Sequence, residues 1–72
     1  MLERNITGKN IKKYRISKEI SQEQLAAKLN ILGIDIDQTI LSRIENQARE
    51  VLDFEIKGIA ISLGVKINDL FD

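Results

Sequence analysis

The chain has 72 residues, a formal net charge of zero, and neither cysteine nor histidine. A chain of this length suits one small domain. The missing residue types exclude disulfides, zinc sites built from thiolates or imidazoles, and catalysis by cysteine or histidine. We therefore expect no enzymatic activity, no metal and no other cofactor. The short apolar runs and the lack of an N-terminal apolar stretch predict a cytoplasmic protein that does not enter a membrane.

The charges are unevenly distributed along the chain. Residues 1–49 contain nine basic and six acidic residues, whereas residues 50–72 contain two basic and five acidic ones. The first part therefore carries a charge of +3 and the second a charge of −3. A molecule with one basic end can meet a polyanion through that end even when its net charge is zero.

Capping residues place a first helix near the N-terminus. Thr7 is a candidate N-cap, and Ile6 and Ile11 have the spacing of a hydrophobic staple around it. We expect residues 1–5 to form a flexible tail ahead of a single domain over residues 6–72.

Two more helices follow with clear boundary signals. Ser21 and Gln24 fit a capping box at the start of the second helix, and Gly33 stands where a left-handed residue would end it. Asp37 is a good N-cap for a third helix that runs from Gln38 to about Glu45 or Asn46. The segment between the second and third helices alternates only briefly and is interpreted as a loop.

A fourth helix is predicted after the N-cap candidate Asp53, with Gly64 as its end, and a last turn covers residues 67–71. No alternating pattern long enough for a strand persists, so the sequence predicts an all-α fold. Apolar residues at helical spacing predict a core that includes Leu25, Leu29, Leu41, Ile44, Ile56, Ala60 and Leu63.

The outer side of the third helix has an unusual composition. At about 100° per residue, its apolar residues fall together on one side. The other side carries glutamine, threonine, serine, arginine and asparagine, with a single charge. Such side chains suit base edges and phosphates, because glutamine pairs with adenine and arginine with guanine through two hydrogen bonds. A solvated face of small polar residues remains the other interpretation of this pattern.

Two motifs point to a known family. Residues 21–29 (SQEQLAAKL) and 41–46 (LSRIEN) together resemble the lambda-repressor-like, Cro-type helix-turn-helix family. Residues 59–65 and 69–71 are similar to its closing helices, so that the resemblance covers residues 6–72. It implies a lambda-repressor-like bundle of five helices that binds double-stranded DNA as a small prokaryotic or phage transcriptional regulator, typically a repressor.

Carried over residue by residue, the resemblance assigns seven positions to the DNA. It implies base reading by Gln38, Thr39, Ser42 and Arg43. It implies phosphate contacts by Gln22, Asn46 and Arg49.

The chain departs from the family pattern in three places. The turn over residues 30–38 is several residues longer than usual. Glu19 and Gln47 stand where the family commonly has glycine. We therefore expect the bend after the third helix to be made differently here.

The partner of Glu45 is open at the level of sequence. Arg49 lies four residues further on, at the spacing of a helical ion pair. Alternatively, Glu45 orients Arg43 or Gln22.

Self-association is a further expectation. Four isoleucines lie off the main apolar stripes or in the long turn: Ile16, Ile31, Ile34 and Ile61. Because helix-turn-helix proteins commonly bind two-fold DNA sites as dimers, we expect a weak homodimer with Ile61 in its interface. A competing hypothesis is an antitoxin-like or other protein-interaction module on the same fold, motivated by the zero net charge and the surplus apolar residues.

Overall fold

The computed structural model describes residues 3–72, which form five α-helices joined by loops. The expected all-α fold is confirmed for this part of the chain. None of these helices is long and apolar enough to cross a membrane. Their bounds are α1 (Gly8–Ser17), α2 (Gln22–Ile31), α3 (Gln38–Glu45), α4 (Asp53–Leu63) and α5 (Ile67–Phe71).

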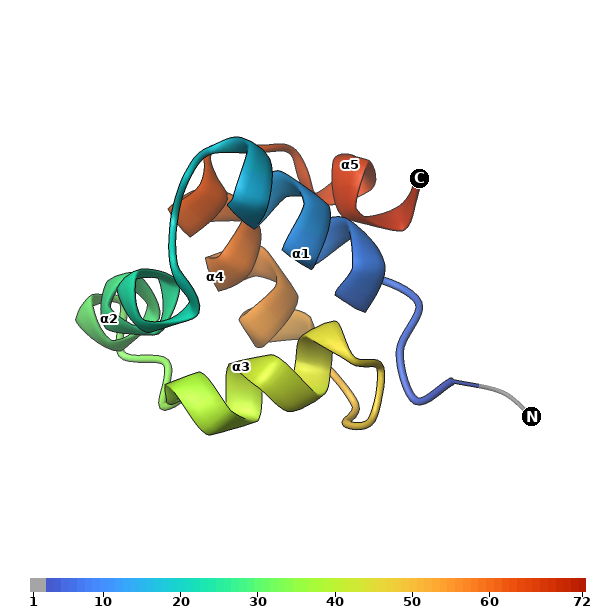
Figure 1. The fold of residues 1–72 in the computed structure, drawn as a ribbon, viewed down its shortest axis with the longest axis horizontal. Helices are drawn as coiled ribbons and strands as arrows, with labels where there is room; N and C mark the ends of the chain where they lie inside the picture. Colours follow the sequence, from blue (N-terminus) through green and yellow to red (C-terminus); the bar gives the residue numbers. More distant parts are fainter. Residues whose placement is uncertain (1–2) are drawn as a thin grey trace.

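The helices pack so that α3 lies at one edge of the molecule (Figure 1). Helix α2 packs against α3 and α4, while α1 packs against α3, α4 and α5. Figure 1 shows α2 beside the first turn of α3, and α5 on the far side of the bundle. This arrangement covers the apolar side of α3 and leaves its polar side facing outward.

The core follows the predicted apolar stripes with two differences. Leu25, Leu29, Leu41, Ile44, Ala60 and Leu63 are buried, as predicted, whereas Ile56 is only half-buried at the edge of the cluster. The core also includes Ile34, which we expected to lie outside it. That expectation was wrong because the long turn brings Ile34 against α4, where a Cβ atom on Gly58 would overlap the Ile34 side chain.

Two of the predicted caps are confirmed. The Ser21 hydroxyl accepts a hydrogen bond from the Gln24 amide at 3.0 Å, and the Gln24 side chain accepts one from the Ser21 amide at 2.8 Å. Asp37 Oδ1 accepts a hydrogen bond from the Ile40 amide at 2.8 Å. Each of these bonds satisfies a backbone donor that the first turn of a helix leaves without a partner.

The first helix starts differently from the prediction. Thr7 makes no side-chain capping bond, and Asn5 Oδ1 accepts from the Gly8 amide instead. The expected staple is absent, because Ile6 is 68% exposed while Ile11 is buried. Of the expected tail over residues 1–5, residues 1–2 lie outside the described residues, and Asn5 is hydrogen-bonded to the domain.

The fourth helix begins one residue earlier than a cap at Asp53 would require. Asp53 is its first helical residue and Leu52 precedes it as the N-cap. The Leu52 amide donates to Glu55 Oε1 at 2.9 Å, so the carboxylate of the first turn reaches back to the cap residue.

Each of the first four helices is followed, one or two positions after its last residue, by a residue in the left-handed conformation. Gly33 and Gly64 have φ of 83° and 70°, as their positions predicted. Glu19 and Gln47 adopt the same conformation, with φ of 57° and 61°. The bend after α3 is therefore made as a glycine would make it, and the expectation of a different bend was wrong. A side chain at such a φ costs about 1 kcal/mol or more.

We expect Glu19→Gly to stabilise the protein by about 1 kcal/mol, because glycine has no Cβ to strain at positive φ. For a domain of this size, that change raises the melting temperature by about 4–8 °C. Glu19→Ala is the matched control, since it removes the charge and keeps the Cβ. Equal melting temperatures for the two variants would contradict the strain at this position.

Candidate nucleic-acid interface

The outward face of α3 carries the residues expected to read bases. Gln38, Thr39 and Arg43 are exposed, whereas Ser42 is half-buried. On the opposite side of the helix, Leu41 and Ile44 are fully buried. The structure therefore places Gln38, Thr39 and Arg43 on an accessible surface and Ser42 at its margin.

Gln22 and Gln38 meet across the helix-turn-helix. Gln38 Nε2 donates a hydrogen bond to Gln22 Oε1 at 2.7 Å. The two residues lie at the first turns of α2 and α3, 16 positions apart in sequence. This bond holds Gln22, which is expected to contact a phosphate, in a fixed position relative to Gln38, which is expected to contact a base.

A buried ion pair anchors this glutamine pair. Gln22 Nε2 donates to Glu45 Oε1 at 3.0 Å. The same carboxylate accepts from Arg15 Nε at 2.6 Å and from Arg15 Nη2 at 3.0 Å. The Glu45 side chain is only 1% exposed, and Arg15 also donates to the Ile20 carbonyl at 2.8 Å. The pair thereby connects α1, the start of α2 and the end of α3.

The structure decides between the partners considered for Glu45. Its orientation of Gln22 is confirmed, and the helical pair with Arg49 was wrong. The sequence analysis missed Arg15, although a signal was present. Arg15 lies four residues after Ile11 and Glu45 four residues after Leu41. Both charges therefore belong to the buried stripes of their helices, where opposite charges are expected to pair.

Arg49 pairs with another carboxylate. Its Nη1 and Nη2 atoms donate to Glu55 Oε1 and Oε2 at 3.0 and 3.1 Å, and Nη1 also donates to the Glu50 carbonyl at 2.9 Å. Burial of Glu55 raises the pKa of its carboxyl, but hydrogen bonds from Arg49 and the Leu52 amide, with the attraction of the Arg49 charge, outweigh burial and lower that pKa. Hydrogen bonding to Glu55 raises the pKa of Arg49. Most of the guanidinium is thus committed to the domain.

Asn46 is exposed at the end of α3. Its backbone N–H closes the last turn of the helix by donating to the Ser42 carbonyl at 3.0 Å. Gln22 and Asn46 therefore mark the two ends of the outward surface, because Gln22 lies beside the first turn of α3.

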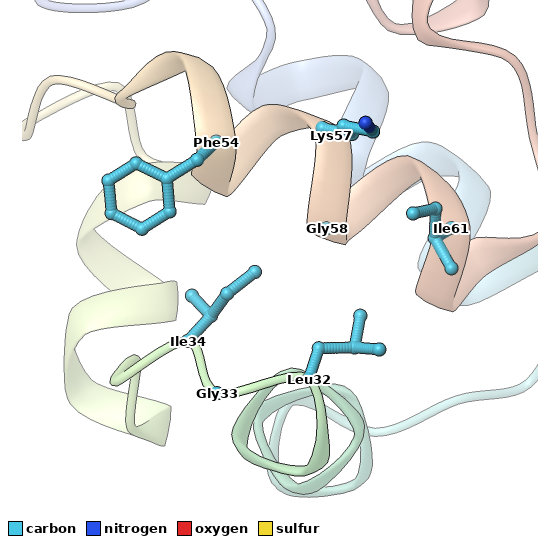
Figure 2. A pocket seen from close by; sticks show the side chains of 7 residues that line it. All are labelled: Leu32, Gly33, Ile34, Phe54, Lys57, Gly58 and Ile61. Atoms are coloured by element: carbon cyan, nitrogen blue, oxygen red, sulfur yellow. The ribbon is translucent and has the colours of Figure 1, made fainter.

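Ile61 lies away from the polar face of α3, at a groove between α4 and the end of α2 (Figure 2). The groove has a volume of about 310 Å³. Its rim carries exposed apolar side chains, with Phe54 at 55% and Ile61 at 59% exposure. Figure 2 shows these two on α4 above Leu32, with Gly58 on α4 and Gly33 on the opposite wall of the groove. The lining residues are Leu32, Gly33, Ile34, Phe54, Lys57, Gly58 and Ile61.

Comparison with known sequences agrees with this geometry. The sequence profile of a family described as helix-turn-helix matches residues 11–70. The chain belongs to the helix-turn-helix family. It is also similar to the control protein C.MunI of Mycoplasma sp, with 38% identity over 65 residues that cover 89% of this chain and 81% of the relative. The family match begins within α1, covers α2, α3 and α4 in full, and ends within α5.

Proposed function

We propose that this protein is a small transcriptional regulator that binds double-stranded DNA by placing α3 in the major groove. The observation that carries the proposal is the exposed polar face of α3, held in register with Gln22 by the bond to Gln38. Membership of the helix-turn-helix family and the similarity to a control protein support a regulatory role. We expect it to act in the cytoplasm, by binding and not by catalysis, in the repressor-like manner of small prokaryotic or phage regulators.

Base reading is assigned to the exposed side chains of α3. A helix fits the major groove, where glutamine suits adenine and arginine suits guanine. We assign these roles to Gln38 and Arg43, with Thr39 beside Gln38. Ser42 is half-buried, so less of its side chain is accessible to a base than in the other three residues.

Phosphate contacts are assigned to the ends of the same surface. Gln22 and Asn46 flank the base-reading residues, and such contacts fix register without reading sequence. Arg49 can bind a phosphate only through the guanidinium N–H groups that are not already bonded to Glu55 and the Glu50 carbonyl. We therefore expect Gln22 and Asn46 to contribute more than Arg49.

The zero net charge is compatible with DNA binding because the charges are unevenly distributed, with +3 over residues 1–49 and −3 over residues 50–72. Two of the carboxylates are in addition paired inside the domain. Glu45 is paired with Arg15, and Glu55 with Arg49. Neither of these acids therefore presents an uncompensated charge to a phosphate backbone.

Selection from a random duplex library at moderate salt tests the function. We expect one enriched motif, and Arg43→Ala should weaken binding to it by about 1–3 kcal/mol while relaxing preference at one base pair. Lys66→Ala removes an exposed positive charge from a residue outside α3 and serves as the control. If Arg43→Ala instead weakened binding to all duplex sequences equally, Arg43 would be a phosphate contact and not a base-reading residue. Failure to enrich any motif would favour a protein-interaction module, whose binding should depend far less on salt.

We also propose that two copies associate through the α4 groove, with Ile61 in the interface. The exposed apolar side chains of Phe54 and Ile61 lie at the edge of the groove, so that one copy offers both a projecting side chain and a space that could receive one. A two-fold dimer uses the same patch on both copies. Two reading helices held in this way would suit a palindromic site.

Ile61→Lys is expected to leave the monomer folded and to weaken dimer formation and operator binding together, because an ammonium group would have to enter the apolar groove. Ile31→Lys is the matched control, since Ile31 is 85% exposed and does not line the groove. Sedimentation equilibrium measures the association. A purely monomeric wild-type protein at millimolar concentration would count against the dimer.

A further inference from the structure

Asn5 joins three parts of the molecule through one side-chain amide. Its Oδ1 atom accepts a hydrogen bond from the Gly8 amide at 2.6 Å, at the start of α1. Its Nδ2 atom donates to the Ile44 carbonyl at 3.0 Å, near the end of α3. The same nitrogen donates to the Arg49 carbonyl at 2.8 Å, in the loop that follows. Both carbonyls lie 39 or more positions away in sequence, so that Asn5 is a long-range connection.

The backbone around Asn5 reinforces this connection. Gln47 Nε2 donates to the Asn5 carbonyl at 3.1 Å, and the Arg4 amide donates to the Gln47 carbonyl at 3.2 Å. Gly8 permits the close approach, since a Cβ atom there would overlap the Ile44 carbonyl oxygen. We call Arg4 and Asn5, with their hydrogen bonds to residues 44–49, the N-terminal clasp. It closes over residues 46–49, the turn that leaves α3.

The clasp adds to the turn's own backbone bonds, in which the Gln47 amide donates to the Ile44 carbonyl at 3.0 Å and the Ala48 amide to the Arg43 carbonyl at 2.9 Å. Gln47 is held at a φ of 61°, a conformation that is strained for a residue with a side chain. The Arg49 carbonyl lies outside any helix, so its hydrogen bond comes from Asn5 and not from a regular ladder. Loss of the Asn5 donors would remove the bond to the half-buried Arg49 carbonyl and leave the Ile44 carbonyl with the Gln47 amide, which would favour a more open turn.

We propose that Asn5 is a positioning residue for DNA binding, which holds the turn over residues 46–49 in the shape that brings its polar groups to the phosphate backbone. The inference rests on the proposed function, because Asn46 and Arg49 matter here as phosphate contacts. Asn5 itself is half-buried and fully engaged inside the domain. It acts through the turn and not by touching DNA.

Asn5→Ser separates this role from helix capping. A serine hydroxyl can still accept from the Gly8 amide, as Ser21 does for Gln24, but both donors to the distant carbonyls are lost. Asn10→Ser is the matched control, since Asn10 Nδ2 donates to the Leu70 carbonyl at 3.0 Å and ties α1 to α5, on the other side of the domain. Both variants would be assayed at a temperature where circular dichroism shows them folded.

The readout is the salt dependence of binding to the selected duplex. We expect Asn5→Ser to weaken binding and to lower the slope of log K against log salt concentration by about one unit. Arg49 is the cationic phosphate contact of this turn, and each lost cationic contact removes about 0.9. Base preference should be retained. Asn10→Ser should keep the wild-type slope even where it lowers the melting temperature by a similar amount.

A double-mutant cycle with Asn46→Ala adds a second readout. If Asn5 acts through the turn, Asn46→Ala should have little further effect in the Asn5→Ser background. Should Asn5→Ser be unfolded at the assay temperature, Gln47→Leu removes only the bond to the Asn5 carbonyl and should lower the slope in its place. An unchanged slope and an additive cycle would overturn the positioning role and leave Asn5 a purely structural residue. A wild-type protein without salt-dependent DNA binding would overturn the proposed function itself, so the two failures are distinguishable.

Discussion

Replacing Glu45 by alanine is expected to lower the free energy of unfolding by about 3–5 kcal/mol, because it leaves a buried arginine without its partner. The Arg15 side chain is only 11% exposed and has three hydrogen bonds, of which two go to Glu45. A domain of this size has only about 5–15 kcal/mol of stability in total. Chemical denaturation followed by circular dichroism measures the loss.

The same change should also weaken DNA binding in conditions where the variant is still folded. Glu45 holds Gln22, which in turn accepts from Gln38. Without the carboxylate, both glutamines regain rotational freedom that DNA binding must then remove. Binding to the selected duplex, measured well below the melting temperature, tests this part of the prediction.

Two controls distinguish the buried pair from an ordinary surface pair. Glu50→Ala removes a carboxylate that pairs with Arg4 at the surface, where both side chains are more than half exposed, and should change the unfolding midpoint little. Arg15→Met combined with Glu45→Met removes both charges and should recover most of the stability lost in the single variant. A single variant as stable as the wild type would contradict the anchoring role of the pair.

Leu29→Ala is expected to cost about 2–5 kcal/mol, from the lost burial of the side chain and the cavity it leaves. Leu29 is fully buried on α2, and its Cδ2 atom lies near the position that a Cβ on Gly58 of α4 would take. The space left by leucine lies between two helices that are both held from other sides, so we expect it to collapse only in part.

Ile31→Ala provides the control on the same helix, because Ile31 is 85% exposed and its removal opens no cavity. Urea unfolding should give a lower midpoint for Leu29→Ala with a similar slope, and an almost unchanged midpoint for Ile31→Ala. Melting temperatures within a degree or two for all three proteins would contradict the place of Leu29 in the core.

Much of the candidate site was predictable because its signals are local. The capping box at Ser21 and the cap at Asp37 each involve residues no more than three positions apart. The starts of α2 and α3 could therefore be predicted directly from the sequence. Helical periodicity then placed Gln38, Thr39 and Arg43 together on the face away from Leu41. Their exposure follows once the apolar side is buried.

The errors at the N-terminus have the opposite origin. Thr7 and Ile6 fitted the local rules for a cap and a staple, yet Asn5 caps α1 and Ile6 is exposed. The competing contacts come from residues 44–49, which approach only after α3 has packed against α1. A rule that considers four neighbouring residues contains no information about them.

The sequence by itself determined the helices, most of the core and the polar face of α3, because these depend on spacings within one or two helical turns. Only the tertiary structure decided which groups pair: Arg15 with Glu45, Glu55 with Arg49, and the end of α3 with Asn5. A long charged or amide side chain can reach several groups, and the choice depends on how the helices pack and which groups they bury together. The left-handed residues Glu19 and Gln47 follow the same logic, since packing on either side of the bend outweighs a local cost of about 1 kcal/mol.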